Sequence, residues 1–519
     1  MITRSSDEQF ASKGRVGMGL WFYPRGGSSQ VARYLSSRLA HAGWNVTLVA
    51  GSLGGPGDAT NAVTFFPDVD LHAVDYTPAV NAHRKGDDAL CEAVPMHASY
   101  EDRGDVPDRF LAAVDPALAE HVTDSWTRIL PAGFVDRSEV FHLHHLTPIH
   151  EALTRLRPQA PVIAHLHGTE LKFMEGVARR SQLAAALGTD LSGMVSLDPR
   201  ALASQQKLDE GQMHLLHATQ WARWRHGSFW AGRLRRIAAR CRRVVVASPS
   251  DRQAASSLLG VDAARIEWIP NGVDTDRFRP RPLAPVERHA LLRHWLVEDP
   301  RGWDETGVPG TIRYRDSDLD RFIDGTGELR PLVLYVGRFT AVKRIPLLLR
   351  SYARARRDFV TPARLLVWGG HPGELEGEHP RRVAANLGLD DVFFVGWRGH
   401  DELPLGLAAA DLVVMPSVNE SFGQSAIEAM ACGVPVIATR SGGPPSFINT
   451  DPVRPTGWLV DPDNEVELAQ ALVDAINRPG ERRRRGERSL ALARASFSWT
   501  SLVPRFEAVY DDLRKQVPA

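Results

Sequence analysis

The chain has 519 residues, of which 43% are hydrophobic and 24% are charged, as expected of a globular protein with two or more domains. Lysine plus arginine and aspartate plus glutamate both number 62, so no excess of positive charge favours nucleic acid as a partner. The three cysteines, Cys91, Cys241 and Cys432, argue against a disulfide framework and a zinc site and favour a cytoplasmic location. Residues 1–10 show no apolar core and no apolar run approaches about 18 residues, so we expect neither a signal peptide nor a membrane-spanning helix.

Short apolar runs rich in β-branched residues alternate with helical patterns along the chain. Most of the runs are continuous, as expected of strands that are covered on both faces. We expect strands at 18–22, 46–50, 140–143, 162–165, 244–247, 332–336, 365–368, 392–395, 412–415 and 434–438. We expect helices at 31–42, 345–356, 424–431, 467–476 and 501–516. This order predicts an α/β fold with parallel sheets and crossover helices.

Two stretches interrupt the alternation. Residues 52–138 are rich in Asp, His and Pro, and residues 279–331 carry Pro, Asp, Gly and Trp without a clear strand. The expected division is a first sheet domain at 1–285 with an insertion at about 52–138, a linker or insertion at 286–330, a second sheet domain at 331–490, and a C-terminal helix within 491–519 that could pack back on the first domain.

The most informative segment follows the strand at 412–415. Glu420 lies in the turn after the strand, the helix is expected to begin near Ser421, and Glu428 lies inside that helix. Amides near Phe422 and Gly423 at a helix start suit phosphate, because free N–H groups and the helix dipole attract anions. Both carboxylates could then accept hydrogen bonds from sugar hydroxyls. A glycosidase pair is disfavoured, since eight helical residues rise about 12 Å and such pairs stand about 5–9.5 Å apart.

Two cations follow the strand at 332–336. Gly337 makes the turn, and Arg338 and Lys343 project from the loop and the next helix start. Cations at this place would stabilise a diphosphate leaving group as its bond to a sugar breaks. The alternative is that both are ordinary surface cations.

The first domain offers weaker signals. His167 lies at the end of the strand at 162–165 and precedes a glycine, which suits close approach of a ligand, although a lone histidine is more often structural. Gly26 and Gly27 follow the first strand and could let the backbone touch phosphate or sugar, but they form neither a Walker loop nor a G-x-G-x-x-G motif.

Together these segments resemble the family 4 retaining glycosyltransferases, which have the GT-B fold. The matching pieces are the Gly26-Gly27 loop, HLHGTE at 165–170, SPSD at 248–251, IPNGVDTDRF at 269–278, YVGR with Lys343, ESFGQSAIEAMACGVPVIAT at 420–439 and GWLVDP at 457–462. The resemblance implies two Rossmann-like parallel-sheet domains facing across a cleft, the first binding acceptor and the second nucleotide-sugar. The insertions and the GGSS loop, which lacks the acidic residue often found after the two glycines, depart from the family.

The resemblance also implies roles for individual residues. Catalytic roles fall to His167, Arg338, Lys343 and Glu420. Donor binding falls to Gly26, Gly27, Asn271, Gly337, Trp397, Arg398, Ser421, Phe422, Gly423 and Glu428, with Glu428 on the ribose and the loop at 396–398 beside the nucleobase. Acceptor contacts are expected from His144, His145, Thr169 and Glu170.

The function implied is transfer of a sugar, with retention, from a nucleotide-diphosphate donor to a small polar acceptor such as a cyclitol, alcohol or secondary metabolite. UDP is the expected nucleotide, with GDP and ADP as alternatives, and no metal or other cofactor is expected. Two further interpretations remain: a sugar phosphorylase or sugar-nucleotide epimerase on the same fold, and a catalytically inactive sugar-nucleotide-binding scaffold.

Three other signals are discounted. Asp-x-Asp occurs five times, which fits chance composition better than a metal site. His142, His144, His145 and His150 could suggest zinc, but no cysteine or clear fourth ligand accompanies them, and lining of an acceptor pocket is favoured. The Trp- and Arg-rich segment 221–243 is expected to be a packed helix rather than a membrane-surface helix.

Overall fold

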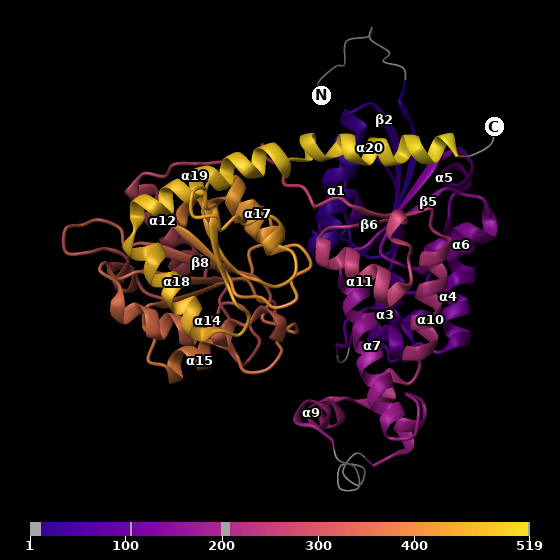
Figure 1. Ribbon diagram of the computed structural model, residues 1–519, viewed down its shortest axis with the longest axis horizontal. Helices are drawn as coiled ribbons and strands as arrows, with labels where there is room; N and C mark the ends of the chain where they lie inside the picture. The colour runs from indigo at the N-terminus through magenta and orange to yellow at the C-terminus, as the bar shows by residue number, and fades with distance from the viewer. Residues whose placement is uncertain (1–11, 104–105, 199–207, 517–519) are drawn as a thin grey trace. The chain divides into compact units, whose positions relative to one another are not determined.

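The computed structural model describes residues 12–103, 106–198 and 208–516, and it divides into two units. The first unit runs up to Ile269 and also includes the chain from Val503, and the second unit runs from Pro270 to Leu502. Each unit is built around one parallel sheet with helices packed on it (Figure 1).

The sheet of the first unit has seven strands in the order β3-β2-β1-β4-β5-β6-β7. They are β1 (Gly14–Leu20), β2 (Trp44–Ser52), β3 (Asp70–Asp75), β4 (Val140–His144), β5 (Val162–His165), β6 (Arg243–Val246) and β7 (Ile266–Trp268). The order reverses between β1 and β4, and open parallel sheets bind ligands outside the carboxyl ends of the strands at such a reversal.

Ten described α-helices belong wholly to the first unit. They are α1 (Gly26–His41), α2 (Ala62–Phe65), α3 (Thr77–Arg84), α4 (Pro116–Ile129), α5 (Ala132–Arg137), α6 (Pro148–Leu156), α7 (Thr169–Ala186), α9 (Glu210–Ala218), α10 (Gly227–Arg240) and α11 (Pro249–Leu259). The region 52–138 thus contains β3 as well as helices, and its Phe110, Leu111 and Trp126 are buried in the core of this unit.

Strand β1 begins four residues before, and ends two residues before, the strand predicted at 18–22. Its glycines interrupt the apolar run, but they are needed for packing. A Cβ on Gly17 would lie 2.9 Å from Phe134, and one on Gly19 would lie 2.6 Å from Leu143. The strand was therefore misplaced because close packing selects glycine where a strand pattern would show valine or isoleucine.

The sheet of the second unit has six strands in the order β10-β9-β8-β11-β12-β13. They are β8 (Leu332–Val336), β9 (Arg364–Trp368), β10 (Val392–Gly396), β11 (Leu412–Met415), β12 (Val436–Thr439) and β13 (Gly457–Val460). This order repeats the first six strands of the first sheet, and its reversal lies between β8 and β11.

The helices of the second unit begin before its first strand. They are α12 (Pro285–Arg293), α13 (Asp316–Leu319), α14 (Ile345–Ala355), α15 (Pro380–Asn386), α16 (Leu403–Ala409), α17 (Gln424–Ala431), α18 (Glu465–Asn477) and α19 (Pro479–Ser496). A short π-helix at His294–Glu298 continues α12.

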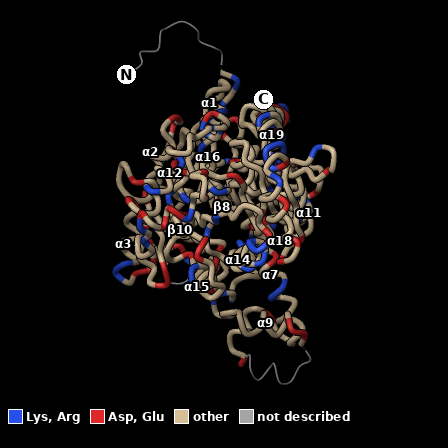
Figure 2. The backbone as a smooth tube through the Cα atoms, turned by 90° about the vertical axis from the view of Figure 1, so that its left-hand side faces the viewer, with Lys and Arg blue, Asp and Glu red and all other residues tan. Residues whose placement is uncertain are grey.

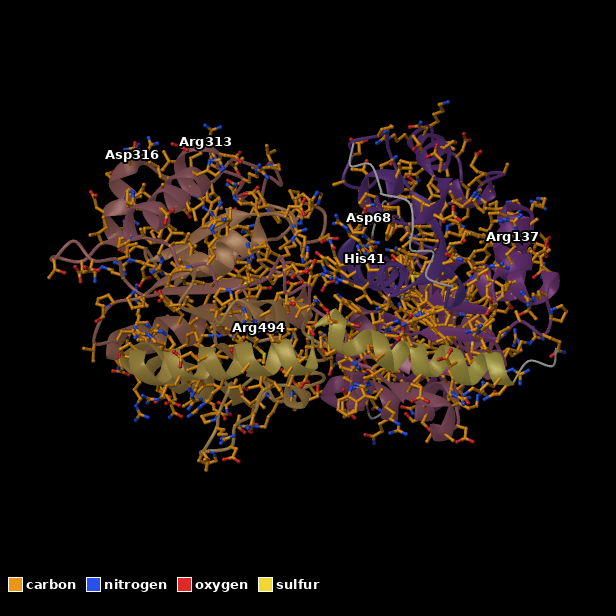
Figure 3. All side chains as sticks on the ribbon, turned by 90° about the horizontal axis from the view of Figure 1, so that it is seen from above. His41, Asp68, Arg137, Arg313, Asp316 and Arg494 are labelled. Carbon is orange, nitrogen blue, oxygen red and sulfur yellow. The ribbon has the colours of Figure 1, made fainter. Side chains whose placement is uncertain are left out.

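The segment 286–330 is part of the second unit and not a separate linker, which corrects the predicted boundaries. The ring centroids of Trp295 and Trp368 of β9 are 5.0 Å apart, and those of Phe322 and Phe393 of β10 are 4.4 Å apart. Figure 3 labels Arg313 and Asp316 in this segment. Because its aromatic side chains are buried against the second sheet, the segment completes that core although it supplies no strand.

The last helix, α20 (Trp499–Lys515), begins in the second unit and ends in the first. The Trp499 ring packs so closely on Gly272 that a Cβ there would lie 2.4 Å from the indole. Further along, Glu507 accepts a hydrogen bond of 2.9 Å from the Trp44 indole of β2. The helical part of 491–519 therefore consists of the end of α19 followed by α20.

Acidic and basic residues are interspersed along the described backbone (Figure 2), in keeping with the equal numbers of 62 in the sequence. Among the described helices, none combines the length and the apolar character that crossing a membrane requires.

Candidate functional site

An ion pair bridges the strand-order reversal of the second unit. Lys343 ends a short 3-10 helix in the connection after β8, and Glu420 lies in the loop after β11. The Lys343 ammonium donates to a Glu420 carboxylate oxygen at 2.6 Å, and the two side chains are 19% and 17% exposed. The structure thus brings together two predicted catalytic residues that are 77 positions apart.

The turn after β8 is fixed by a buried tyrosine. Burial, with the Glu420 carboxylate nearby, holds the pKa of Tyr335 well above its usual value, so the hydroxyl stays protonated. That hydroxyl donates to the backbone carbonyl of Arg338 at 3.0 Å. A Cβ at Gly337 would lie 2.7 Å from the hydroxyl oxygen, so the predicted turn glycine is needed for this contact.

Two glycines that the sequence analysis did not single out hold the Glu420 loop. The amide of Gly443 donates to the backbone carbonyl of Glu420 at 2.7 Å. At Gly442, which has φ of 74°, a Cβ would lie 1.9 Å from the same carbonyl oxygen. The Glu420 backbone is therefore locked by a neighbouring loop, and the signal for it was the unexplained Ser441-Gly-Gly after β12.

Helix α17 begins at Gln424, as in the predicted range 424–431 and three residues after Ser421, with Gly423 as its N-cap. Gly423 has φ of 106°, and a Cβ there would lie 3.0 Å from Met415, so another residue would be strained. No side chain caps this helix, and its first turn carries no acid. Ser421 is half-buried and Phe422 is buried. The helix start therefore keeps the character of an anion site.

Glu428 is buried on α17 and hydrogen-bonded to a histidine that the sequence analysis missed. The His400 Nε2 lies 2.8 Å from a Glu428 carboxylate oxygen, and Glu428 is 3% exposed. His400 is itself held, because Arg277 donates to its carbonyl at 3.1 Å and Phe278 packs on its ring at 5.1 Å. The PNGVDTDRF segment thus supports Glu428 through His400, a connection that spacing in the sequence does not reveal.

Asn271 lies in the same segment. Its side-chain oxygen is buried and has no hydrogen-bond partner among the described residues. The next residue, Gly272, accepts a hydrogen bond of 3.0 Å from the Gln424 side chain at the start of α17. The loop before the second sheet is therefore attached to the helix that carries Glu428.

The structure separates Trp397 from Arg398, which were predicted to flank a nucleobase together. Trp397 is 52% exposed and remains a candidate for that role. The Arg398 guanidinium is fully buried and donates to the carbonyls of Trp295, at 2.8 Å, and Asp299. The Arg398 side chain thus anchors the segment before β8, and the position of the loop 396–398 beside a nucleobase stays a prediction.

In the first unit, Gly26 begins α1 with φ of 75° and Gly27 follows it. A Cβ on either glycine would have no neighbour within 4 Å, and no side chain caps the helix. Both glycines thus leave the helix start accessible, as the prediction of backbone contact with a ligand requires.

His167 pairs with His144 at the carboxyl ends of β5 and β4. The His144 Nδ1 and the His167 Nε2 are 2.9 Å apart. Burial, reinforced by neighbouring histidines, holds the pKa of both imidazoles well below the usual value, so both are neutral at pH 7. The structure therefore joins one predicted catalytic residue to one predicted acceptor residue.

His145, Thr169 and Glu170 form a buried cluster around the loop after β4. The Glu170 carboxylate lies 2.7 Å from the His145 Nδ1, and its other oxygen accepts from the Thr169 hydroxyl and the His167 amide, each at 3.3 Å. Glu170 is fully buried. We correct the prediction that Glu170 and His145 contact an acceptor directly, because they hold each other and brace the loop.

The candidate zinc histidines are only partly brought together. Nitrogen atoms of His142, His144 and His165 lie within 4.8 Å of one another, which makes this the one such group among the described residues. Two of the three are hydrogen-bonded to each other, with the His142 Nε2 3.0 Å from the His165 Nδ1. His150 lies apart and contacts the Thr147 backbone at the start of α6.

Two family models match the chain, one on each unit. Glycosyltransferase Family 4 matches residues 25–277, and Glycosyl transferases group 1 matches residues 316–490. The chain belongs to the family 4, group 1 glycosyltransferases. The resemblance that was drawn from the motifs is thereby confirmed.

A curated relative of this glycosyltransferase is the D-inositol 3-phosphate glycosyltransferase of Corynebacterium diphtheriae, 33% identical over 238 residues. That alignment covers 44% of this chain and 54% of the relative, so the chain spans about half the length of the curated relatives it matches.

Solved structures share the fold. Sucrose-phosphate synthase from Thermosynechococcus elongatus has a TM-score of 0.60 at 20% identity, covering 97% of this chain and 100% of that one. Anabaena HepE in complex with UDP and glucose has a TM-score of 0.56 at 15% identity, covering 95% of this chain and 99% of that one. The fold of the glycosyltransferase is therefore of the GT-B type, with two Rossmann-like parallel-sheet domains.

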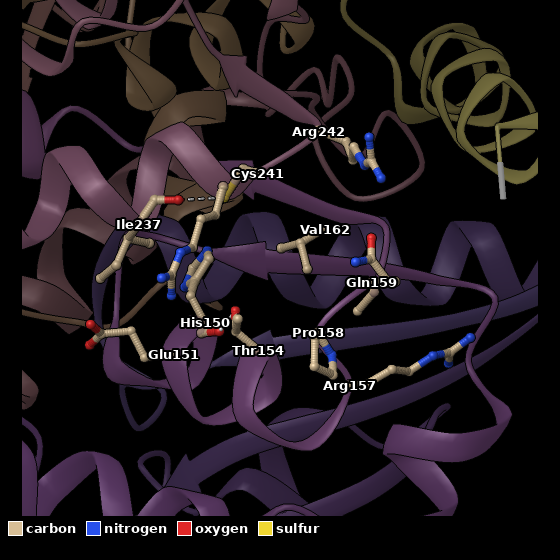
Figure 4. A pocket seen from close by; sticks show the side chains of 12 residues that line it. His150, Glu151, Thr154, Arg157, Pro158, Gln159, Val162, Ile237, Cys241 and Arg242 are labelled. Atoms are coloured by element: carbon tan, nitrogen blue, oxygen red, sulfur yellow. Dashed lines mark hydrogen bonds between the residues drawn. The ribbon is translucent and has the colours of Figure 1, made fainter.

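One cavity of about 300 Å³ lies in the first unit, away from His144 and His167 (Figure 4). It is lined by Val162 at the start of β5, by Arg242 just before β6, and by the end of α10. Cys241 donates from its thiol to the Ile237 carbonyl in its wall. The cavity is thus at the amino ends of the strands, and His150, one of the histidines considered for zinc or for an acceptor pocket, is among the residues that line it.

The aromatic side chains of the Trp- and Arg-rich segment are packed inward. Trp221, Trp224 and Trp230 are all buried in the first core. Trp230 also donates to the Val114 carbonyl at 2.8 Å. This burial favours the packed helix that the sequence analysis preferred over a membrane-surface helix.

Proposed function

We propose that this chain transfers a hexose, with retention of configuration, from a nucleotide-diphosphate sugar to a small polar acceptor. The observation that carries the proposal is the joined pair Lys343–Glu420 beside the uncapped start of α17. As part of the proposal, the reaction takes place in the cytoplasm and needs neither a metal ion nor another cofactor.

The donor site is assigned to the second unit. The start of α17 at Gly423, with Arg338 and Lys343 from the connection after β8, would hold the diphosphate through backbone N–H groups and two cations. Glu420 would accept hydrogen bonds from hydroxyls of the transferred sugar, and Glu428 from the ribose. The bond to His400 supports this role, because it fixes the buried Glu428 carboxylate in one orientation.

The proposed reaction step needs no side chain as a general base. The bond between the anomeric carbon and the phosphate oxygen breaks, and the acceptor oxygen bonds to the same face of the sugar. The acceptor proton passes to the departing phosphate oxygen. Negative charge grows on the diphosphate as this happens, so Arg338 and Lys343 stabilise the transition state more than the bound donor.

The first unit is assigned to the acceptor and to His167, which would face the reacting sugar. UDP is the favoured nucleotide, since HepE, which shares the fold, binds UDP. The name of the curated relative supports a cyclitol as the first acceptor to test, including D-inositol 3-phosphate.

The donor assignment is tested by the thermal stability of the purified protein with UDP, GDP, ADP and TDP, each with and without magnesium. A nucleotide at about 100 times its Kd should add about 2.7 kcal/mol to the free energy of unfolding. We expect the largest shift with UDP, the same shift without magnesium, and loss of the shift in Glu428→Ala. Glu487→Ala, on the exposed side of α19, serves as the matched control and should keep the shift.

Turnover is then measured with the sugar of the nucleotide that binds. Loss of transfer in Glu420→Ala is expected, and undiminished transfer would refute the site. Absence of a shift with every nucleotide, together with sugar transfer to inorganic phosphate, would instead identify a phosphorylase. Nucleotide binding without turnover on any acceptor would favour the scaffold.

A further inference from the structure

Four histidines and one tyrosine form a continuous column on one face of the first sheet, which we call the histidine column. His142 and His144 alternate along β4, and His165 and His167 alternate along and just beyond β5. Alternate residues of a strand point to the same face, and the parallel register pairs His144 with His165. Helix α20 covers this face, where the Tyr510 hydroxyl lies 2.7 Å from the His142 Nδ1.

The column divides into two hydrogen-bonded parts. One part joins Tyr510, His142 and His165, and the other joins His144 and His167. The rings of His144 and His167 are 20° from parallel, with their centroids 5.2 Å apart and the facing nitrogens 2.9 Å apart. The two rings are thus joined edge to edge by a single hydrogen bond.

Only one proton can lie in that hydrogen bond. The pKa of each imidazole is held well below its usual value, chiefly by burial, so each ring is neutral and has one N–H donor and one bare acceptor nitrogen. Either His144 donates from Nδ1 to His167, or His167 donates from Nε2 to His144. These two arrangements place the remaining protons on different atoms.

The surroundings of His144 decide between the two arrangements. Its other nitrogen, Nε2, is buried and has no hydrogen-bond partner among the described residues. If His167 were the donor, His144 would carry its proton on this Nε2, which would bury an N–H without an acceptor. If His144 is the donor, Nε2 is only a bare acceptor. A buried N–H group without an acceptor is rarer, and costs more free energy, than a buried acceptor without a donor, so the arrangement with His144 as donor is favoured.

We infer that His144 is a positioning residue that fixes His167 as the tautomer protonated on Nδ1, a neutral hydrogen-bond donor at the carboxyl end of β5. The inference concerns the same site as the proposed function. It depends on that function only for the statement that His167 contacts the transferred sugar. His167 then donates to a sugar oxygen and does not serve as a base. This role fits a step in which the departing phosphate accepts the acceptor proton.

The tautomer can be measured without any substrate. In protein labelled with ¹⁵N-histidine, long-range proton–nitrogen correlation spectra at pH 7.5 distinguish a protonated from a bare nitrogen on each ring. The His167 ring is assigned by its loss in His167→Phe. We expect its Nδ1 to carry the proton. A proton on Nε2, or on both nitrogens, of the assigned His167 ring would overturn the inference, whether or not any variant of His144 folds.

Two variants test the role of His144. In His144→Asn the side-chain amide takes the place of Nδ1 and still donates, so the His167 tautomer should persist. In His144→Phe the donor is gone, and the Nε2 form of His167 should become populated. A tautomer that is unchanged in His144→Phe, or lost in His144→Asn, would refute the role. Tyr510→Phe, which removes a hydrogen bond from the other part of the column, is the control and should leave His167 unchanged.

Activity adds a second readout. His144→Phe should lower kcat at least tenfold with little change in nucleotide affinity, and His144→Asn should recover most of kcat. If the protein binds no nucleotide but the spectra agree with expectation, the proposed function fails and the tautomer stands. If nucleotide binds and transfer occurs while His167 is protonated on Nε2, the proposed function stands and this inference fails.

Discussion

The two units present opposite chemistry at the carboxyl ends of similarly ordered strands. In the second unit the reversal between β8 and β11 carries an ion pair, Lys343 with Glu420, and the helix after β11 carries the Glu428 carboxylate. In the first unit the reversal between β1 and β4 leads to neutral imidazoles that are bonded to one another. The same topology therefore supports a site suited to an anionic diphosphate and one suited to uncharged hydroxyls.

The electrostatic difference has a common physical origin. Burial in an apolar surrounding disfavours the charged form of a group unless a partner of opposite charge accompanies it. The imidazoles of the histidine column are buried beside one another, and both burial and the neighbouring histidines disfavour their charged forms, so they are neutral. Lys343 and Glu420 remain partly exposed and neutralise each other. Four predictions test this difference between the two units.

The largest expected effect is a loss of stability of the first unit in mild acid. Burial lowers the pKa of His142 to about 3 and that of His97 and His150 to about 4, against 6.5 in the unfolded chain. Below pH 6.5 the unfolded chain therefore binds protons that the folded chain does not, so the free energy of unfolding falls as pH decreases toward 4. Each histidine contributes about 1.4 kcal/mol per pH unit, or about 4 kcal/mol per unit for the three.

Hydrogen exchange at pH 7 and pH 5 would measure this effect, with the second unit as an internal reference at each pH. The first unit should open first. In the second unit His379 is the one described histidine whose pKa is resolved as lowered, and burial is its main cause. Equal loss of protection in both units would show that the buried imidazoles do not govern acid stability.

The next effect concerns the charged pair of the second unit. Lys343→Met removes a cation from the proposed diphosphate site and leaves Glu420 without this partner. In other enzymes, removal of one group that stabilises charge in the transition state lowers the rate about 100- to 1,000-fold. We expect kcat/KM to fall by a similar factor here, which corresponds to about 3–4 kcal/mol of transition-state stabilisation. Steady-state kinetics with the identified nucleotide-sugar would measure it. The exposed Lys515→Met is the control, and an equal loss there would remove the special status of Lys343.

A smaller effect is expected at His400. His400→Phe removes the hydrogen bond to the buried Glu428 carboxylate, which should weaken nucleotide binding about tenfold, or about 1.4 kcal/mol. His400→Gln places an amide nitrogen near the position of Nε2 and should restore most of the affinity. Calorimetric titration with the nucleotide measures the affinity of each variant. Unchanged affinity in His400→Phe would show that the hydrogen bond from His400 to Glu428 does not contribute to nucleotide binding.

The smallest effect is expected at the far end of the histidine column. Tyr510→Phe removes the hydroxyl bonded to His142 and should lower the free energy of unfolding by about 1 kcal/mol. Nucleotide affinity should not change, because the donor site is assigned to the other unit. Chemical denaturation and nucleotide titration measure the two quantities, and a change in affinity alone would contradict this division of roles.

What could be predicted from the sequence was mostly local. Strands β5, β8 and β11 and helix α17 were predicted at their observed bounds or nearly so, because buried parallel strands appear as uninterrupted apolar runs. Edge strand β3 was missed, since Asp70–Asp75 alternates between exposed and partly buried positions. The segment at 286–330 was predicted as a linker or insertion, and its place in the second unit could not be predicted because its contribution to the core comes from separate aromatic residues and not from a strand.

The candidate site shows the same limit. Glu420, Gly423 and Glu428 lie in one short segment whose order along the chain nearly fixes their positions. The pairing of Glu428 with His400 depends on packing between distant segments, so no spacing could indicate it. The resemblance placed Arg398 beside the nucleobase together with Trp397, but neighbouring side chains can point in different directions, and that of Arg398 points into the protein.

The course of α20 also bears on how the protein is made. The ribosome synthesises residues 1–269 before 270–502, yet the face that carries His142 and the Trp44 indole at the start of β2 receive their cover from residues beyond Val503. This face of the nascent first unit therefore stays uncovered until the whole of the second unit has been translated. A chaperone that shields this face during synthesis would be needed longer here than for a chain whose domains are completed in order.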